Sequence, residues 1–294
     1  MSTPRIYLDN AATTPMDAEV VDLMAETMRL CYGNPSSIHF LGRETRILIE
    51  KARKTMAALL GCAPSELFFT SGGTESDNMI CRYLVEQGDV QRIISSKLEH
   101  HAITHTLENL AHHRGIRVDW VKHDSRGVID LEDLESLLAQ DQGSSNRTLV
   151  TLMHGNNELG NLLDLERVSA LCQTYQAFFH SDTVQTMGHY TFDLKALDID
   201  FITCAAHKFH GPKGIGFLYV NKRIKMTPMI LGGAQERGFR GGTENISGIV
   251  GLSKAFDLAY EDVRVHQEHV QGLKTYMMER LKAHFPDLLF HGDT

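Results

Sequence analysis

Short apolar runs rich in β-branched and aromatic residues alternate along this chain of 294 residues with longer segments of helical periodicity. This alternation predicts an α/β fold, with a mainly parallel central sheet flanked by helices. Strands are predicted at Leu67–Thr70, Arg92–Ser95, Arg117–Val121, Thr148–Met153, Ala177–Ser181, Phe201–Cys204 and Gly216–Val220. Helices are predicted at Met16–Leu30, Arg43–Leu60, Glu75–Glu86, Ala102–His112, Leu131–Ala139, Leu165–Tyr175 and Ile246–Ala283. The last helix is long enough to contain a break, and Pro15 is predicted to lie in the first turn of the first helix.

The composition excludes several classes of protein. A hydrophobic share of 42% and a charged share of 22% are typical of a globular protein and exclude disorder for the chain as a whole. The net charge of -8 disfavours nucleic acid or an anionic membrane as the main partner. No apolar stretch approaches the ~20 residues that span a bilayer. The five cysteines include no CxxC pair, which disfavours disulfides and zinc and favours a reducing, cytoplasmic setting.

The loop after the first predicted strand contains Ser71, Gly72, Gly73 and Thr74 and leads into a helix. Glycines let the backbone approach an anion closely, and hydroxyls and free helix N–H groups can bind it. The alternative is an ordinary helix cap formed by Thr74 with Asp77. Neither of the GxGxxG and GxxxxGK[ST] fingerprints for nucleotide binding is present.

Histidines and an amide follow the next predicted strands. His100 opens a helix, and His101 and His105 lie one helical turn apart beside it. A metal site is one interpretation of this cluster, but no third ligand stands at a diagnostic spacing. Solvent-exposed or helix-capping histidines are the simpler alternative. Asn157 would project polar donors from the end of strand 148–153.

Two charged side chains follow strands later in the chain. Asp182 ends an apolar strand, so its carboxylate is expected to be partly buried and to need a partner, with a structural salt bridge as the alternative. Lys208 follows strand 201–204 and two alanines, whereas most lysines are exposed to solvent. The intervening stretch is long enough for a crossover connection, so both side chains can flank one cleft at the carboxyl ends of strands.

These loops together provide an anion-binding turn, a flat ring, a buried carboxylate and a lysine amine. Pyridoxal 5'-phosphate (PLP) uses all four groups. Its phosphate needs the anion site, its ring needs a stacking partner, its ring nitrogen needs a carboxylate, and its aldehyde bonds a lysine. The sequence therefore predicts PLP as the cofactor.

Eight segments between Tyr7 and Asn245 resemble the motifs of the cysteine desulfurase family, in the family's order. They are YLDNAATTP, YGNPSSIH, FTSGGTESDN, EHHA, MHGNNELG, HSDTVQ, AHKFHGPKGIG and GGAQERGFRGGTEN. The resemblance implies the class-V aminotransferase group and the PLP-dependent transferase fold type I. It predicts an N-terminal segment (1–14) associated with a small domain, a large PLP-binding domain (15–255) and the start of an incomplete small α/β domain (256–294).

The resemblance also assigns roles to residues. Lys208 would bind the PLP aldehyde, and His100 would stack on the ring and move protons around the substrate thiol. Asp182 would pair with the ring nitrogen, and Gln185 would donate a hydrogen bond to the ring hydroxyl oxygen. No residue is implied as a metal ligand.

Further contacts are implied at the two ends of the cofactor. Gly73, Thr74 and His207 would hold the phosphate. Asn157 would lie near the ring oxygen and the substrate, and Asn34 would line the substrate end of the cleft. Thr243 would reach the phosphate of the neighbouring subunit's cofactor, which implies a homodimer with shared sites.

The implied reaction converts L-cysteine to L-alanine. The sulfur passes to an enzyme cysteine as a persulfide, for a sulfur-acceptor or scaffold protein in iron–sulfur cluster or thio-cofactor assembly. The alternative enzymes are a selenocysteine lyase-like protein or another class-V lyase or aminotransferase, which lack the extended GGAQERGFRGGTEN segment. A non-catalytic PLP-fold scaffold and a metal-dependent hydrolase built on the histidines are the alternatives from other classes.

Two departures from the family pattern affect these expectations. Ala205 stands where family members usually carry a serine, so one hydroxyl contact to the phosphate is lost and weaker PLP retention is expected. The family's nucleophilic cysteine and its substrate-binding arginine lie beyond the position of Thr294, and none of the five cysteines occupies a matching motif. We therefore expect this sequence to be a fragment of a longer chain, or else a shortened relative with incomplete activity. Cys204 is interpreted as a core residue.

Overall fold

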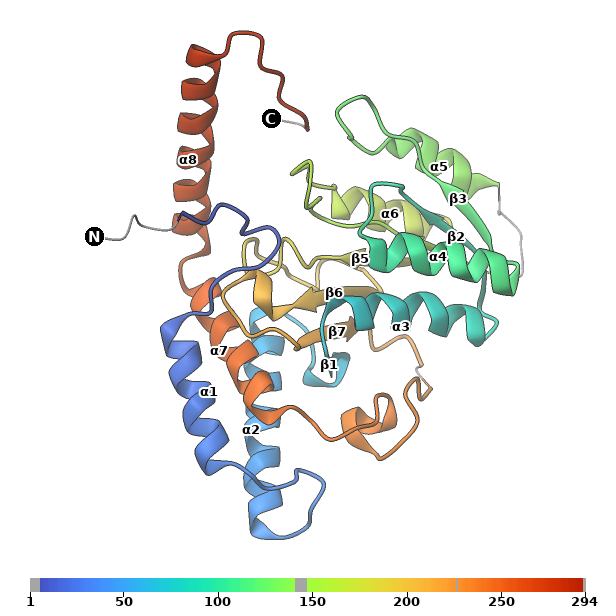
Figure 1. Ribbon diagram of the computed structural model, residues 1–294. Coiled ribbons are helices and arrows are strands. Elements are labelled where there is room, and N and C mark those ends of the chain that lie inside the picture. Colours follow the sequence, from blue (N-terminus) through green and yellow to red (C-terminus); the bar gives the residue numbers. More distant parts are fainter. Residues whose placement is uncertain (1–5, 141–146, 226, 293–294) are drawn as a thin grey trace.

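A seven-stranded sheet forms the centre of the computed structural model, which describes residues 6–140, 147–225 and 227–292. The strands are β1 Leu67–Thr70, β2 Val90–Ser95, β3 Arg117–Trp120, β4 Arg147–Thr151, β5 Phe178–Asp182, β6 Phe201–Ala205 and β7 Gly216–Val220. Their order across the sheet is β1-β7-β6-β5-β4-β2-β3 (Figure 1). β7 runs antiparallel to β1 and β6, and the other pairings are parallel. The prediction of a mainly parallel sheet is confirmed.

Helices cover both faces of this sheet (Figure 1). They are α1 Ala18–Leu30, α2 Phe40–Leu59, α3 Gly73–Glu86, α4 His101–Arg114, α5 Leu131–Ala139, α6 Leu165–Thr174, α7 Ile246–Glu261 and α8 Val263–His284. α3 and α4 pack on one face, whereas α2, α5, α6 and α7 pack on the other. No helix in the described ranges is both long and apolar enough to cross a bilayer.

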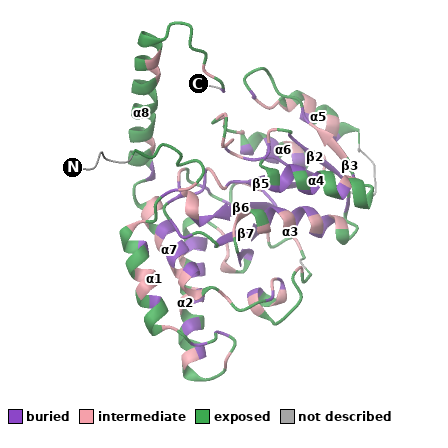
Figure 2. Ribbon diagram, viewed as in Figure 1, coloured by how far each residue is buried: buried purple, intermediate pink, exposed green. Residues whose placement is uncertain are grey.

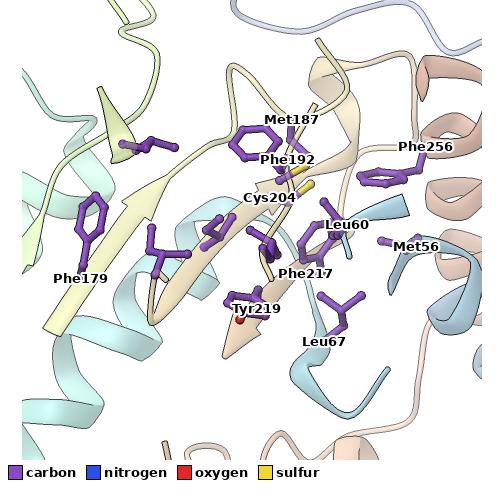
Figure 3. Packing of buried hydrophobic residues seen from close by; sticks show 14 of the residues in the cluster. Met56, Leu60, Leu67, Phe179, Met187, Phe192, Cys204, Phe217, Tyr219 and Phe256 are labelled. Carbon is purple, nitrogen blue, oxygen red and sulfur yellow. The ribbon is translucent and has the colours of Figure 1, made fainter. Parts of the chain in front are cut away.

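The core consists of two hydrophobic clusters, one on each face of the sheet. In β7, Phe217 and Tyr219 belong to the cluster beneath α2 and α7, whereas Leu218 and Val220 face α3 and α4. This alternation follows from the strand period of two residues. Figure 3 shows the first cluster, in which Met56 of α2 packs among the strand side chains. Apolar side chains on both faces therefore fix the register of the strands, and with it the position of the loops that follow them.

The first helix starts later than the sequence predicts. Asp17 is its N-cap, and the Asp17 carboxylate accepts a hydrogen bond of 2.8 Å from the backbone N–H of Glu19. A capping aspartate satisfies one of the free N–H groups at a helix start, so the helix begins at Ala18. Pro15 lies before the helix rather than in its first turn, and that prediction is wrong.

The predicted break in the C-terminal helix is confirmed. α7 ends at Glu261, and Asp262 adopts the non-helical angles φ -136° and ψ 39° before α8 begins at Val263. α7 packs against α1 and α2, whereas almost all of α8 is exposed (Figure 2). The domain boundaries expected from the sequence stay predictions, and residues 1–5 and 293–294 of the outer two segments lie outside the described residues.

Candidate active site

A cavity of about 520 Å³ opens at the carboxyl ends of the parallel strands, within the size range of small-molecule sites. Its walls come from the segments that follow β1, β2, β4, β5 and β6, together with part of the N-terminal segment. Eight of the ten residues predicted from the sequence line it. They are Gly73, Thr74, His100, Asn157, Asp182, Gln185, His207 and Lys208. Five separate loops, far apart in the chain, are thus brought to one place.

The N-terminus of α3 forms one end of this cavity. Gly72 is the N-cap residue, at φ 146°, and no side chain caps the helix. Gly73 leaves no room for a side chain, because a Cβ atom there would come within 2.8 Å of the Val184 Cγ2 atom. The interpretation of Thr74 and Asp77 as an ordinary cap is therefore wrong. An uncapped helix N-terminus presents N–H groups and a partial positive charge, which suit a phosphate.

His100 lies at the N-terminus of α4 and serves two purposes. Its Nδ1 atom accepts a hydrogen bond of 3.1 Å from the Ala102 N–H, so the ring caps the helix, and it also lines the cavity. With Nδ1 as an acceptor, the neutral ring carries its proton on Nε2. His101 and His105 are exposed, stack with ring centroids 4.7 Å apart, and do not line the cavity. Within the described ranges, no group of three or more His, Cys, Asp or Glu side chains is placed to hold a metal ion.

Lys208 ends a short 3-10 turn, Ala206–Lys208, that directly follows β6. Its Nζ atom donates hydrogen bonds to the carbonyl oxygens of Ala11 and, at 3.0 Å, Ala12. Burial lowers the pKa of Lys208, although the carboxylates of Asp182 and Asp9 oppose this effect. A lower pKa increases the share of neutral amine, which is the form that bonds an aldehyde.

Asp182 is the last residue of β5 and is only 5% exposed, so its expected burial is confirmed. Its Oδ1 atom accepts a hydrogen bond of 2.8 Å from the Val184 N–H. Burial raises the pKa of Asp182, while that N–H group, His100 and Lys208 act in the opposite direction. The carboxylate is thus stabilised from the cavity side, where a protonated ring nitrogen would face it.

The N-terminal segment closes one side of the cavity, which was not predicted from the sequence. The Ala11 carbonyl oxygen accepts a hydrogen bond of 2.8 Å from Gln185 Nε2, and Thr13 Oγ1 lies 3.1 Å from His207 Nδ1. The Thr14 hydroxyl donates to the His207 carbonyl oxygen at 2.9 Å. The small and hydroxyl-bearing residues of the string NAATTP allow this close approach of backbone to backbone.

Thr243 and Asn34 lie outside the cavity. Thr243 is exposed and lines a separate cavity of about 120 Å³ with Ser71 and Arg240. Asn34 is exposed in the connection between α1 and α2, and its Oδ1 atom accepts a hydrogen bond of 2.9 Å from the Ser36 N–H. Their roles in substrate binding and in a neighbouring subunit's site stay predictions.

No cysteine lines the cavity in the part of the chain that the structure describes. Cys81, Cys172 and Cys204 are buried, and burial raises the pKa of each thiol. Cys62 is half-buried, and burial raises its pKa to about 12. The prediction that Cys204 is a core residue is confirmed, since its side chain packs in the cluster of Figure 3.

Comparison with known proteins gives consistent results. Residues 6–293 match the model of the family described as aminotransferase class-V. Cysteine desulfurase IscS of Dictyoglomus turgidum is 40% identical over 98% of this chain and 72% of its own length. Putative cysteine desulfurase IscS 1 of Bacillus subtilis is 41% identical over 95% of this chain and 72% of its own length. The solved structure of a NifS-like protein superimposes with a TM-score of 0.90 at 39% identity, covering 95% of this chain and 76% of that one.

Proposed function

Since this chain belongs to the class-V aminotransferase family and, within it, to the cysteine desulfurases, we propose that it uses PLP to convert L-cysteine to L-alanine. Enzymes of this family depend on PLP in general. One observation carries the proposal. Lys208 and Asp182, from the ends of neighbouring strands, line a single cavity with the uncapped N-terminus of α3.

The residues of the cavity fit the chemical groups of PLP one by one. The N–H groups of α3 at Gly73 and Thr74 suit the phosphate, and His207 adds a further polar contact at that end. The buried carboxylate of Asp182 suits a protonated ring nitrogen, and the half-buried amine of Lys208 suits the aldehyde. These side chains and N–H groups therefore match PLP both in their charges and in their chemical types.

PLP, when bound, supplies an electron sink that lets the α carbon of an amino acid lose its proton. The Lys208 amine, whose pKa is lowered by burial, is the base that takes this proton and returns one to the product. The Asp182 carboxylate would accept a hydrogen bond from the protonated ring nitrogen and so keep that nitrogen charged. The Ala102 N–H donates its hydrogen bond to Nδ1 of His100. The Nε2 atom of His100 is therefore the one that can exchange a proton with the substrate thiol.

The sulfur needs a thiolate acceptor that comes from outside the described cavity lining. A thiolate attacks the substrate sulfur, the carbon–sulfur bond breaks, and the carbon keeps the electron pair and takes up a proton. The resulting persulfide would carry sulfur toward iron–sulfur cluster or thio-cofactor assembly. The chain spans 72% of the length of two relatives that it matches.

A soluble thiol makes this proposal testable. The chain is loaded with PLP, given L-cysteine and excess dithiothreitol, and assayed for L-alanine and sulfide. A parallel sample is reduced with borohydride and its peptides are mapped by mass. We expect a PLP adduct on Lys208 and L-alanine from L-cysteine. An adduct with activity only on L-selenocysteine, or only with L-alanine and a keto acid, would point to the alternative enzymes. A colourless protein without an adduct would overturn the PLP proposal.

We also propose that two copies share their sites through the segment that carries Thr243. The ion pair from Arg240 Nε to Glu75 Oε1, 2.8 Å long, ties this segment to α3. The buried ion pair from Arg53 to Glu236, 2.7 Å long, ties it to α2. A firmly anchored and exposed threonine suits contact with a second copy. Sedimentation should show a dimer, and Thr243→Ala should weaken PLP binding; a monomer with unchanged affinity in the variant contradicts the proposal.

A further inference from the structure

Two carboxyl groups are buried together at the floor of the cavity, and the proposed function uses only one of them. Asp77, on the second turn of α3, is 1% exposed, and Asp182 is 5% exposed. Both line the cavity. The Asp77 Oδ1 atom has no hydrogen-bond partner. A buried oxygen without a partner is unusual in a folded protein and calls for an explanation.

The groups that surround Asp77 bring no positive charge to it. His180 Nε2, from β5, lies 3.6 Å from Asp77 Oδ1, but burial lowers the pKa of His180 to about 3 and keeps it neutral. The two ring nitrogens of His180 lie 2.8 Å from Thr151 Oγ1 and 3.0 Å from Thr203 Oγ1. Besides Asp182, the titratable groups near Asp77 are the buried carboxyl of Glu99 and the buried thiol of Cys81.

Asp182 has the opposite surroundings. The Val184 N–H, His100 and Lys208 all favour its charged form. Asp77 lacks these three supports, and only the Thr203 hydroxyl favours its charged form. Burial and the Asp182 carboxylate outweigh that hydroxyl and together raise the pKa of Asp77 well above its usual range. Two adjacent buried carboxyls cannot both carry a charge without a large cost, so they share a proton. The groups around the two carboxyls favour a charged Asp182 and therefore a protonated Asp77.

We propose that Asp77 is a neutral acid whose O–H donates a hydrogen bond to the Asp182 carboxylate and orients it toward the cavity. Asp77 is thus a positioning residue, and its role toward PLP rests on the proposed function. Because a neutral acid adds no charge, the floor of the cavity keeps one negative charge, which matches one protonated ring nitrogen. The hydrogen bond also removes freedom of rotation from the Asp182 side chain, as a second layer of residues does in many sites.

The protonation state can be measured without any cofactor. Infrared spectra of the PLP-free protein at neutral pH should contain the carbonyl stretch of a protonated carboxylic acid, shifted by labelling with carbon-13 aspartate. Asp77→Asn should remove the aspartate-labelled band. Glu99→Gln is the matched control, since burial raises the pKa of Glu99 as well but its band does not respond to that label. A labelled band that survives in Asp77→Asn and vanishes in Asp182→Asn would overturn the assignment.

The hydrogen bond is tested by comparing two substitutions. Asp77→Asn keeps a donor of the same size, whereas Asp77→Leu keeps the size and removes the donor. The leucine variant should weaken PLP binding roughly tenfold, and the asparagine variant should stay within roughly threefold of wild type. Thermal unfolding of the PLP-free variants reports whether each is folded. Equal weakening in both variants, or none in either, would overturn the proposal. Failure of wild type to form the Lys208 adduct would reject the proposed function, while the infrared result would still decide the state of Asp77.

Discussion

The two ends of the cavity offer a ligand different physical means of binding. At the α3 end, the donors are main-chain N–H groups, and Gly73 and Thr74 are half-buried or exposed. At the other end, formed by the end of β5 and the second turn of α3, Asp182 and Asp77 line the cavity, and His180 Nε2 lies 3.6 Å from Asp77 Oδ1. All three side chains are almost completely buried, and each has a pKa shifted by burial. A helix terminus does not titrate and changes little with its surroundings. The charge state of a buried carboxylate, by contrast, depends on every neighbouring group. Changes at the first end should therefore alter mainly the affinity for the cofactor, whereas changes at the second end should alter reactivity more strongly than affinity.

The largest effect is expected between the two ends, at Lys208. Lys208→Ala should abolish both the visible absorption of the bound cofactor and the formation of L-alanine, because no other lysine lines the described cavity. Absorption spectra and a coupled alanine assay measure the two effects. Lys213→Ala, on the exposed turn that follows, is the control and should keep both. Loss of absorption in the control but not in Lys208→Ala would contradict the assignment of Lys208.

The buried end should separate reactivity from binding. Asp182→Asn keeps the shape of the side chain and removes its charge, so PLP binding should fall by roughly tenfold or less, whereas exchange of the substrate α proton should fall by roughly a hundredfold or more. Deuterium incorporation from heavy water measures the exchange. Near-normal exchange in this variant would show that the ring nitrogen does not depend on Asp182.

The same end also makes stability depend on pH. The pKa of His180 falls from 6.5 to about 3 on folding, so the folded protein binds fewer protons at this group than the unfolded chain. The contribution of neutral His180 to the free energy of unfolding is fully present above pH 6.5. It is lost as the pH falls toward 3, by up to about 1.4 kcal/mol per pH unit. Urea unfolding of wild type and His180→Gln at several pH values measures the difference. The stability gap should narrow in acid, and a constant gap would contradict a neutral buried histidine.

The sequence was sufficient to predict most strands and strand ends, because their signal is local. Apolar runs such as Phe201–Cys204 end at a polar or small residue, and ligands of α/β sheets bind there. The reversal of β7 was not predicted, although the connection between β6 and β7 is too short for a helical crossover, which needs a dozen or more residues. The start of α3 was predicted at Glu75 instead of Gly73, because an uncapped helix end has no side-chain signal.

The role of Asp77 could not be predicted from local pattern. Its spacing from Thr74 matches a helix cap, which is the common use of an aspartate near a helix start. Its actual neighbours, Asp182 and His180, come from β5, about a hundred residues away in the chain. Only the packing of α3 on the sheet brings these groups together. The contribution of Ala11 and Ala12 to the cavity was missed for the same reason.

The smallest effect is expected at the α3 end. Ala205 is 2% exposed and lines the cavity, and a Cβ atom built on Gly73 would lie 3.9 Å from the Ala205 Cβ. Ala205→Ser adds a hydroxyl donor beside the helix terminus and should tighten PLP binding roughly tenfold, about 1.4 kcal/mol. Exchange of the substrate α proton in the loaded enzyme should change by less than roughly threefold, because the electron sink lies at the other end. Ala205→Val, which adds bulk without a donor, should not tighten binding. If the serine variant changed the exchange of the substrate α proton as strongly as the affinity for PLP, the two ends of the cavity would not control reactivity and affinity separately.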